Sequence, residues 1–360
     1  MLTTSASKTA LANVRVFDGQ RLSEPRTVVI DGRVIGTDPT GAREIDASGA
    51  VLLPGLIDAH VHLHGPQTLE QLASWGVTTG LDMATWPAEL VASLRKATGF
   101  ADFRTAGLPA IGPGGGHAHI PGMPEHAIIR TAKDARNHVA ARVEEGADYI
   151  KGMAEAPGDG GPDQESLRAL VEAARAHGKR TVIHAATTGA FTAAVASGAD
   201  FITHIPVDGI TATDVAKMKE AGQIAVPTLT MMEAVLAGRA PITGPLKSVA
   251  DLHAAGVEIL AGTDANSQPG APANIEHGQS IHHELELLVQ AGLSPAQALR
   301  AATILPAHAF GLTDRGGIEP GLRADLVLID ANPLVDITAT RKIRAIWCAG
   351  QPVAPPQPAE

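Results

Sequence analysis

The sequence predicts an α/β protein: a (β/α)8 TIM barrel with a small composite β-sandwich domain built from both ends of the chain. From about residue 51 to 309, eight short apolar runs are mostly followed by a helical pattern. Eight such units over about 250 residues match the size of a (β/α)8 barrel. The two chain ends carry strand-like runs instead. We therefore expect residues 1–54 and 310–360 to form the sandwich and residues 55–309 to form the barrel.

Short β-branched runs at both ends of the chain indicate strands. The N-terminal runs are ALANVRVFDG and TVVIDGRVI, and the C-terminal runs are GLRADLVLID and KIRAIWCAG. Asp31 and Gly32 form the dipeptide that tight two-residue hairpins prefer, since glycine adopts positive φ without strain. The two β-rich ends are expected to meet in one small domain.

The eight runs of the middle segment are expected to be the barrel strands. They are VLLPGLIDAHVH, VTTGLDM, FRTAGLPAIG, DYIKGM, RTVIHA, DFITHI, IAVPTL and VEILAGTD. In a barrel of this kind, active sites gather at the C-terminal ends of the strands. Polar side chains that could bind metal should therefore lie at the last positions of these runs.

Two segments between the runs have clear helical signals. QESLRALVEAARAHGK places apolar residues at i, i+3, i+4 and i+7, namely Leu167, Leu170, Val171 and Ala174, with Gly178 as a C-terminal stop. In SPAQALRAAT, Ser294 is the expected N-cap, Pro295 the first helical residue and Gln297 the capping-box partner.

Composition limits the class of protein. The 360 residues are 44% hydrophobic and 18% charged, which is typical of a globular protein. The net charge of −10 argues against a nucleic-acid partner, and no apolar run is long enough to span a membrane. The single cysteine, Cys348, cannot form an internal disulfide, and the N-terminus lacks a secretory apolar segment. These features predict a cytoplasmic protein with a small-molecule substrate.

The first barrel run ends in GLIDAHVHLH, which places Asp58, His60, His62 and His64 on one face of a strand. An isolated H-x-H is most often a solvated edge, so the later runs must supply further ligands for a metal site. They do, because polar groups occupy the ends of three more runs and Lys151 lies in a fourth. The candidate metal ligands are His60, His62, Lys151, His184, His204 and Asp264.

The motifs PGLIDAHVH, YIKGM, VIHA, ITH and GTDA resemble those of the amidohydrolase superfamily of metal-dependent hydrolases. The C-terminal stretch AGLSPAQALRAATILPAHAFGLTDRGGIEPGLRADLVLID adds to this resemblance, which extends over nearly the whole chain. Together with NIEHGQSIHHELELLVQAGL, the motifs most resemble the group that contains Xaa-Pro dipeptidases and lysine or arginine carboxypeptidases. The resemblance also suggests a homo-oligomer.

The resemblance implies a centre of two divalent metal ions, zinc best suited to so many imidazoles. His60 and His62 would bind the buried ion, His184 and His204 the exposed ion, and Asp264 would be both a ligand and the catalytic proton carrier. Lys151 would bridge the ions after carboxylation to a carbamate. The alternative is an ordinary strand-end lysine and a mononuclear site.

Several further residues are candidates for contact with substrate. His117 and His119 lie in the glycine-rich segment IGPGGGHAHIPGMP, where at least one could bind the carbonyl or the developing oxyanion. His277 follows the last run, and alternation places Tyr149 on the Lys151 face, where it could lie deep in the barrel. Asp58 could fix an imidazole or the rim. His64, His282 and His283 are expected to be structural or solvated.

The predicted reaction is hydrolysis of an amide or peptide bond by metal-activated hydroxide. Related deaminases carry a glutamate three residues after the histidine of the fifth strand, whereas this chain has Thr187 there. A lactone, carbamate or phosphotriester hydrolase is the closest alternative, and a non-catalytic binding or scaffold barrel is a further one. Arg130, Arg239 and Lys247 are candidate partners for a substrate carboxylate, among which the sequence does not choose.

Overall fold

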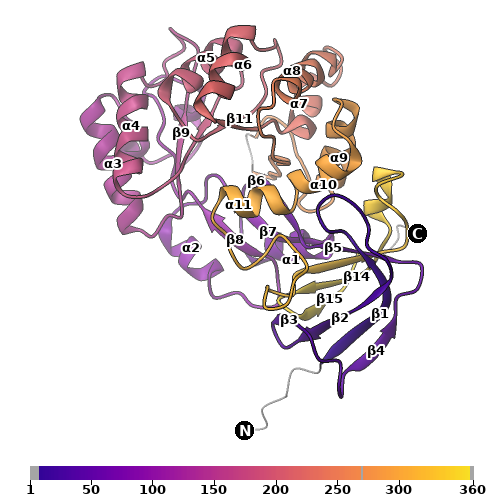
Figure 1. Cartoon of the computed structure of the whole chain (residues 1–360). Helices are drawn as coiled ribbons and strands as arrows, with labels where there is room; N and C mark the ends of the chain where they lie inside the picture. The colour runs from indigo at the N-terminus through magenta and orange to yellow at the C-terminus, as the bar shows by residue number, and fades with distance from the viewer. Residues whose placement is uncertain (1–7, 269–270, 357–360) are drawn as a thin grey trace.

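The computed structural model describes residues 8–268 and 271–356 and consists of a β-sheet region joined to an α/β barrel (Figure 1). In Figure 1 the indigo strands of the N-terminus lie beside the yellow strands of the C-terminus, as expected for a composite domain. Within the described residues, no helix is both long and apolar enough to cross a membrane.

The composite region is one eight-stranded sheet. Its strand order is β15-β14-β13-β5-β1-β2-β3, and β4 pairs with β1. The N-terminal strands are β1 (Thr9–Val16), β2 (Arg26–Asp31), β3 (Val34–Gly36), β4 (Arg43–Asp46) and β5 (Val51–Pro54). The C-terminal strands are β13 (Leu326–Ile329), β14 (Ile343–Cys348) and β15 (Gln351–Val353).

Strand β1 joins the two halves of this sheet because it changes partners along its length. Its first residues pair with β2 and β4, and its last residues pair with β5. The register shifts between Leu11 and Val14, where Asn13 has a φ of 59°, a bulge that bends the strand. Both halves therefore contribute to one apolar core, which includes Leu11, Val28, Leu52, Leu326, Leu328 and Trp347.

The predicted hairpin is present, with its turn shifted by one residue. Asp31 pairs with Val34, so Gly32 and Arg33 form the two-residue turn and Asp31 ends β2. Gly32 has a φ of 62°, the conformation for which glycine is suited. Cys348 is buried in β14 as a free thiol.

Seven of the eight predicted runs contain a barrel strand. They are β6 (Leu56–Val61), β7 (Val77–Asp82), β8 (Asp102–Thr105), β9 (Ile150–Met153), β10 (Thr181–His184), β11 (Phe201–Thr203) and β12 (Ile224–Val226). Neighbours within each group are parallel: β6 with β7 and β8, and β9 through β12. Short bridges close the ring. Ala110 pairs with Gly152, the eighth run pairs through Ile259 with Ala225, and Ala265, directly after that run, pairs with Val61.

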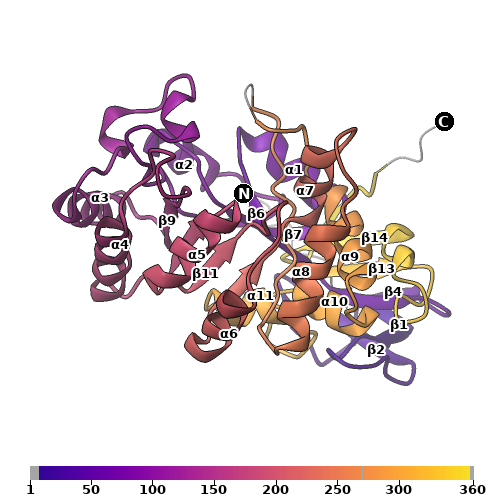
Figure 2. The ribbon, with the colours of Figure 1, turned by 90° about the horizontal axis from the view of Figure 1, so that it is seen from above.

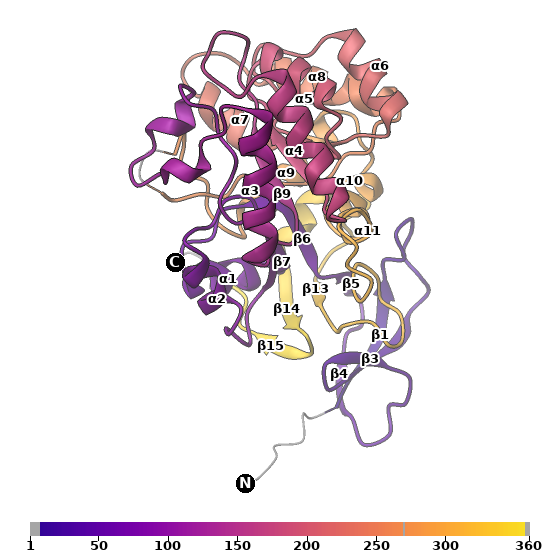
Figure 3. The same ribbon diagram turned by 90° about the vertical axis from the view of Figure 1, so that its left-hand side faces the viewer.

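Helices cover the outside of the strand ring, as Figures 2 and 3 show from two further directions. They are α1 (Pro66–Ser74), α2 (Ala88–Leu94), α3 (Ala132–Glu144), α4 (Gln164–Ala176), α5 (Thr188–Ser197), α6 (Ala212–Ala221), α7 (Leu229–Leu236), α8 (Thr243–Ala254), α9 (Ser280–Gln290), α10 (Pro295–Ala301) and α11 (Ile304–Ala309). The described residues also form three short 3-10 helices: η1 (Gly116–His119), η2 (Glu125–Ala127) and η3 (Ile337–Arg341).

Both predicted helices form where the sequence signals place them. Helix α4 buries the predicted apolar positions, and Asp163, which we did not anticipate, caps it by accepting a hydrogen bond from the Ser166 amide. Helix α10 begins at Pro295 with the complete reciprocal capping box of Ser294 and Gln297.

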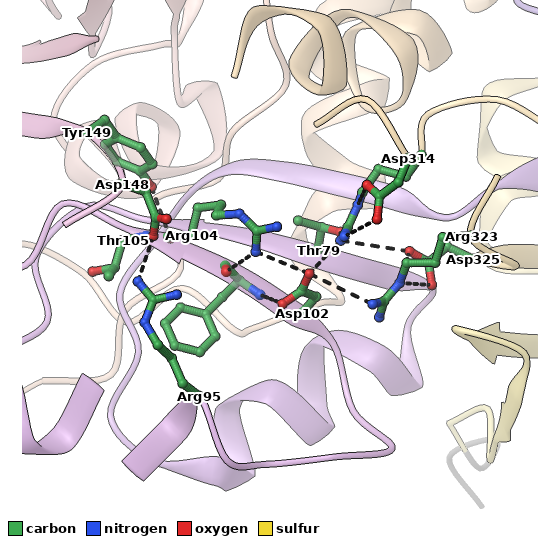
Figure 4. A network of polar contacts seen from close by, with 12 residues as sticks. Thr79, Arg95, Asp102, Arg104, Thr105, Asp148, Tyr149, Asp314, Arg323 and Asp325 are labelled. Atoms are coloured by element: carbon green, nitrogen blue, oxygen red, sulfur yellow. Dashed lines mark hydrogen bonds and ion pairs between the residues drawn. The ribbon is translucent and has the colours of Figure 1, made fainter. Parts of the chain in front are cut away.

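A buried arginine joins the barrel to the composite sheet. Arg315 lies 2.8 Å from Asp102 of β8 and from its neighbour Asp314, and it donates a hydrogen bond of 2.9 Å to Thr79 of β7. Arg323 continues the network to Asp325, immediately before β13 (Figure 4). This ionic network lies at the base of the barrel, away from the C-terminal ends of its strands.

Candidate metal centre

A cavity of about 280 Å³ opens at the C-terminal ends of the barrel strands. The six candidate ligands from five different strand ends all line it: His60, His62, Lys151, His184, His204 and Asp264. The fold therefore brings together side chains that are as far apart as 204 positions in the sequence.

Three of these residues form a compact ligand group. One potential ligand atom each from His60, His62 and Asp264 lies within 4.8 Å of the others. Asp264 Oδ1 is 2.9 Å from His62 Nε2 and 3.3 Å from His60 Nε2. Two imidazole nitrogens and a carboxylate oxygen are a donor set that suits zinc and related divalent ions.

Threonine hydroxyls orient two of the imidazoles. His60 Nδ1 is 2.8 Å from Thr203 Oγ1, and His204 Nδ1 is 2.5 Å from Thr228 Oγ1. A partner at Nδ1 fixes the rotation of the ring and leaves Nε2 directed elsewhere. For His60 that atom faces Asp264, and for His204 it lies 2.9 Å from His184 Nδ1.

The imidazoles form a continuous chain across the cavity. Ring centroids are separated by 5.3 Å for His60 and His62, 4.8 Å for His60 and His204, and 4.6 Å for His204 and His184. His117 extends the chain, at 4.7 Å from His184. Burial lowers the pKa of His204 to about 3, so this ring is neutral and able to coordinate a cation.

Lys151 is an unusual occupant of a buried site. Its Nζ is buried and has no hydrogen-bond partner within the part of the chain that the structure describes. Burial lowers its pKa to about 7, although Asp264 and Asp82 oppose this shift. A buried amine without a hydrogen-bond partner is costly, and this one lies beside a carboxylate and several imidazoles. Its environment therefore fits a side chain that binds or reacts with a species outside the protein chain.

Asp264 is held in a backbone conformation that few non-glycine residues adopt, with a φ of 59°. Asp58 supports it, because its carboxylate accepts hydrogen bonds from the amides of His60 and Thr263 and from the Thr263 hydroxyl. Asp58 thus fixes the rim between ligands rather than an imidazole. Burial would raise the pKa of Asp264, but His60 and His204 outweigh it and hold the pKa well below its ordinary range.

Asp82, at the end of β7, is a site residue that we did not predict. It accepts hydrogen bonds from the hydroxyls of Thr85 and Thr105 and from the Leu63 amide, next to His62. Burial raises its pKa, and the hydroxyl contacts oppose this effect. The rule that polar groups end the barrel runs could have identified Asp82, because it is the last polar residue of the run VTTGLDM.

His117 is the one histidine of the glycine-rich segment that lines the cavity. Its Nδ1 is 3.5 Å from Glu155 Oε1, on the loop after β9. The two loops meet backbone to backbone, since the Gly114 amide donates to the Gly160 carbonyl at 2.9 Å. His119 is exposed, with its Nδ1 directed at the Gly115 carbonyl, and does not line the cavity.

The other two predicted substrate contacts lie outside the cavity. His277 is buried behind the first strand end and donates a hydrogen bond of 2.7 Å from Nε2 to the His62 carbonyl. The Tyr149 hydroxyl donates to the carbonyl of Arg104 (Figure 4) and to that of Asp82. Its ring contacts Phe310. Tyr149 is therefore a core residue beneath the site, because the strand face that it shares with Lys151 continues below the cavity.

The histidines expected to be structural do have structural contacts. His64 bonds with Ser267 and Gln268, and His282 lies between Trp75 and Thr340. His283 pairs with Glu233 at the molecular surface.

None of the three candidate partners for a substrate carboxylate lines the cavity. Arg130 pairs with Glu125, and Lys247 pairs with Asp251 on the exposed side of α8. Arg239 is an exposed residue beyond α7. The lining residues that sequence reasoning missed include Trp86, Met123, Met153, Asn266 and Gln268.

Comparisons with known proteins find relatives that match most of the chain. Among sequences, an uncharacterized protein of Mycobacterium bovis is 29% identical, with 85% of each chain covered. An adenine deaminase of Methanoregula boonei is 28% identical over 91% of this chain but only 56% of its own length.

Among solved structures, a Xaa-Pro dipeptidase with methionine bound in its active site superposes with a TM-score of 0.83. It is 22% identical and covers 96% of this chain and 99% of its own, a likeness that establishes the barrel fold with its additional domain. Residues 51–354 match the Amidohydrolase family, and the chain belongs to that family.

Proposed function

We propose that this amidohydrolase-family protein cleaves an amide or peptide bond with the help of two divalent metal ions. The observation that carries the proposal is the placement of Asp264, whose carboxylate lies against two imidazoles in a cavity that five histidines and one buried lysine line. Such a cluster of metal ligands is expensive to bury unless a cation balances it.

The donor set fits two ions. His60, His62 and Asp264 would hold one, and the pair of His184 Nδ1 and His204 Nε2, 2.9 Å apart, would hold the other. Carboxylation of Lys151 would supply the shared ligand, consistent with its unpartnered Nζ among the described residues. When bound, divalent ions act as Lewis acids and lower the pKa of coordinated water towards about 7. Zinc suits the imidazole-rich set best.

Asp264 would carry the proton. Its low pKa keeps the carboxylate ionised, so it can accept a proton from the attacking water. It can then deliver that proton to the departing amine, which is otherwise a poor leaving group. Its fixed backbone and its contacts with His60 and His62 hold the carboxylate oxygens in one place during both transfers.

His117 would bind the carbonyl oxygen of the substrate. It stands at the cavity wall 4.7 Å from the His184 ring, and Glu155 lies 3.5 Å from its Nδ1. A positioned imidazole donor can stabilise the negative charge that develops on this oxygen.

The position of Thr187 favours amide cleavage over deamination. Its hydroxyl accepts a hydrogen bond from the Ala190 amide and caps α5, so it serves the helix rather than proton transfer. Deamination is the competing activity because one relative is an adenine deaminase. Lactone, carbamate and phosphotriester hydrolysis remain alternatives, since the same centre could attack each of these electrophiles.

A substrate panel tests the proposal. Metal-reconstituted protein would be incubated with dipeptides, N-acyl amino acids and acyl anilides, in parallel with lactones, carbamates, phosphotriesters and adenine. We expect turnover within the amide set, reduced at least about a thousandfold in Asp264→Asn but retained in the surface control Asp251→Asn. Turnover confined to another substrate class, or no turnover of any amide with any divalent metal, would refute the proposal.

A further inference from the structure

Beside the ligands, part of the cavity wall is apolar. It is lined by Trp86, Pro109, Ile120, Met123, Met153 and Pro272. Trp86, Met123 and Met153 also belong to one hydrophobic cluster with the buried residues Leu108 and Ile111, so this wall is backed by packed side chains. A rigid apolar wall of this kind favours an apolar substrate group.

The cavity offers no cation for a substrate anion. Among the described residues that line it, Lys151 is the only lysine or arginine, and its side chain is buried among the candidate metal ligands. The remaining polar groups beyond the ligands are His117, Asn266 and Gln268, which suit neutral hydrogen-bonding partners. Along the chain, the arginine nearest to Met123 is Arg130. Its guanidinium donates a hydrogen bond of 2.8 Å to the Glu125 carboxylate.

A carboxylate at this wall would lose its hydration without gaining a charged partner. Such a transfer is costly, whereas an uncharged amide or aromatic group gains from burial against Trp86 and the two methionines. The proposed metal ions would not remove this cost, because their role is to polarise the scissile carbonyl and not to pair with a second, anionic group.

We propose that the substrate is uncharged on the portion that fills this cavity: a neutral amide with an apolar group, rather than a dipeptide or N-acyl amino acid with a free carboxylate. This inference rests on the proposed metal-dependent function and specifies its substrate class. Neutral donors and acceptors on the substrate would be recognised by His117, Asn266 and Gln268.

Paired hydroxamates test the inference without requiring turnover. The hydroxamate group binds the metal ions, so para-carboxybenzohydroxamate and para-carbamoylbenzohydroxamate differ only in the charge presented to the wall. Calorimetric titration of metal-loaded protein should give a Kd at least about tenfold lower for the neutral compound. Equal affinities, or tighter binding of the carboxylate, would overturn the inference.

A matched pair of variants supplies the missing cation. Ile120 is partly buried at the wall, so Ile120→Lys adds a charge where Ile120→Gln adds only polarity and similar bulk. We expect Ile120→Lys to bind the carboxylate at least about tenfold more tightly than Ile120→Gln does. If the lysine has no effect and the wild type does not discriminate, the wall does not select for charge and the inference is wrong.

The outcome is separable from that of the proposed function. Neutral selectivity in hydroxamate binding without turnover of any amide would refute amide hydrolysis and leave the charge selectivity standing. Turnover of amides with a preference for free carboxylates would support the hydrolase and refute the inference. Failure of both hydroxamates to bind would remove the metal centre on which both proposals depend.

Discussion

Hydroxyl groups behind the imidazoles determine how well the site is prepared for metal. Thr203 and Thr228 each contact the Nδ1 of a histidine, and Thr228 has a φ of 50°. Glu284 in turn accepts hydrogen bonds from the amides of Leu229 and Thr230, immediately after Thr228. Residues that are not ligands therefore help to fix the orientation of the ligands.

Removing one of these hydroxyls should weaken metal binding without unfolding the protein. Thr203→Val keeps the shape of the side chain but leaves His60 Nδ1 without its partner. We expect metal affinity to fall about 10- to 100-fold, measured by competition with a chelator.

The matched control is Thr78→Val, a buried position whose hydroxyl has no hydrogen-bond partner among the described residues. It should leave metal affinity unchanged. Equal effects of the two substitutions would show that the contact between Thr203 and His60 does not prepare the site.

A second residue, His282, should make the stability of the folded protein depend on pH. His282 of α9 is fully buried, its Nε2 donates to the Trp75 carbonyl, and burial lowers its pKa from 6.5 to about 4, with Arg341 adding to the shift. The folded protein thus keeps this ring neutral while the unfolded chain binds a proton. Its contribution is complete above pH 6.5 and is lost as the pH falls towards 4.

We expect the free energy of unfolding of His282→Gln to depend less steeply on pH between 6.5 and 4 than that of the wild type. The difference in slope should approach about 1 kcal/mol per pH unit, measured by denaturant titration at several pH values. His177→Gln, at the exposed end of α4, should retain the wild-type slope. Parallel profiles for wild type and His282→Gln would contradict this account.

At the scale of elements, two glycine-rich loops position one wall of the cavity. The loop that carries His117 and the loop after β9 pack so closely that a Cβ on Gly160 would lie 2.4 Å from the Gly114 carbonyl carbon. Gly160 also has a φ of 79°. Glycine is needed here for the close approach of two backbones and not only for the turn.

Gly160→Ala should separate the loops and displace His117. We expect kcat/KM on the cognate amide to fall at least about tenfold, because misplacement of a binding group raises the barrier. The control is Gly158→Ala, which has a comparable backbone strain with a φ of 98° but no atom within 4 Å of its Cβ. If both variants lose activity equally, strain in the loop rather than its packing against Gly114 is responsible.

The elements also show what could be predicted from the sequence. The strand runs, the cap at Ser294 and the ligands His60 and His204 follow from periodicity and from the rule that functional groups gather at strand ends. His119, His277 and Tyr149 could not be placed in this way. Their positions depend on how a loop folds and how deep the cavity extends, which the packing of distant segments decides. Asp82 follows the rule that functional groups gather at strand ends, so it could have been predicted from the sequence.

For the whole molecule, the ends of the chain meet in one sheet, and Arg315 links that sheet to the barrel. Its side chain is 3% exposed, and its guanidinium contacts Asp102, Asp314 and Thr79. Removing one partner from a buried ion pair leaves uncompensated charge and is costly, unlike the loss of a surface pair.

Arg315→Met should therefore lower the free energy of unfolding by about 3–5 kcal/mol in urea titrations. Arg344→Met removes an exposed pair with Asp330 and should cost about 1 kcal/mol or less. Similar losses for the two variants would mean that the junction contributes no more than an ordinary surface contact.

The central claim, a centre of two ions completed by Lys151, is tested most directly by metal stoichiometry. Inductively coupled plasma mass spectrometry would be applied to wild type and Lys151→Ala, each desalted without chelator. We predict about two metals per chain in the wild type and a sharp fall in the variant, because a carbamate can bridge two ions. One metal or fewer, unchanged by the substitution, would contradict the account and make Lys151 a bystander in a mononuclear site.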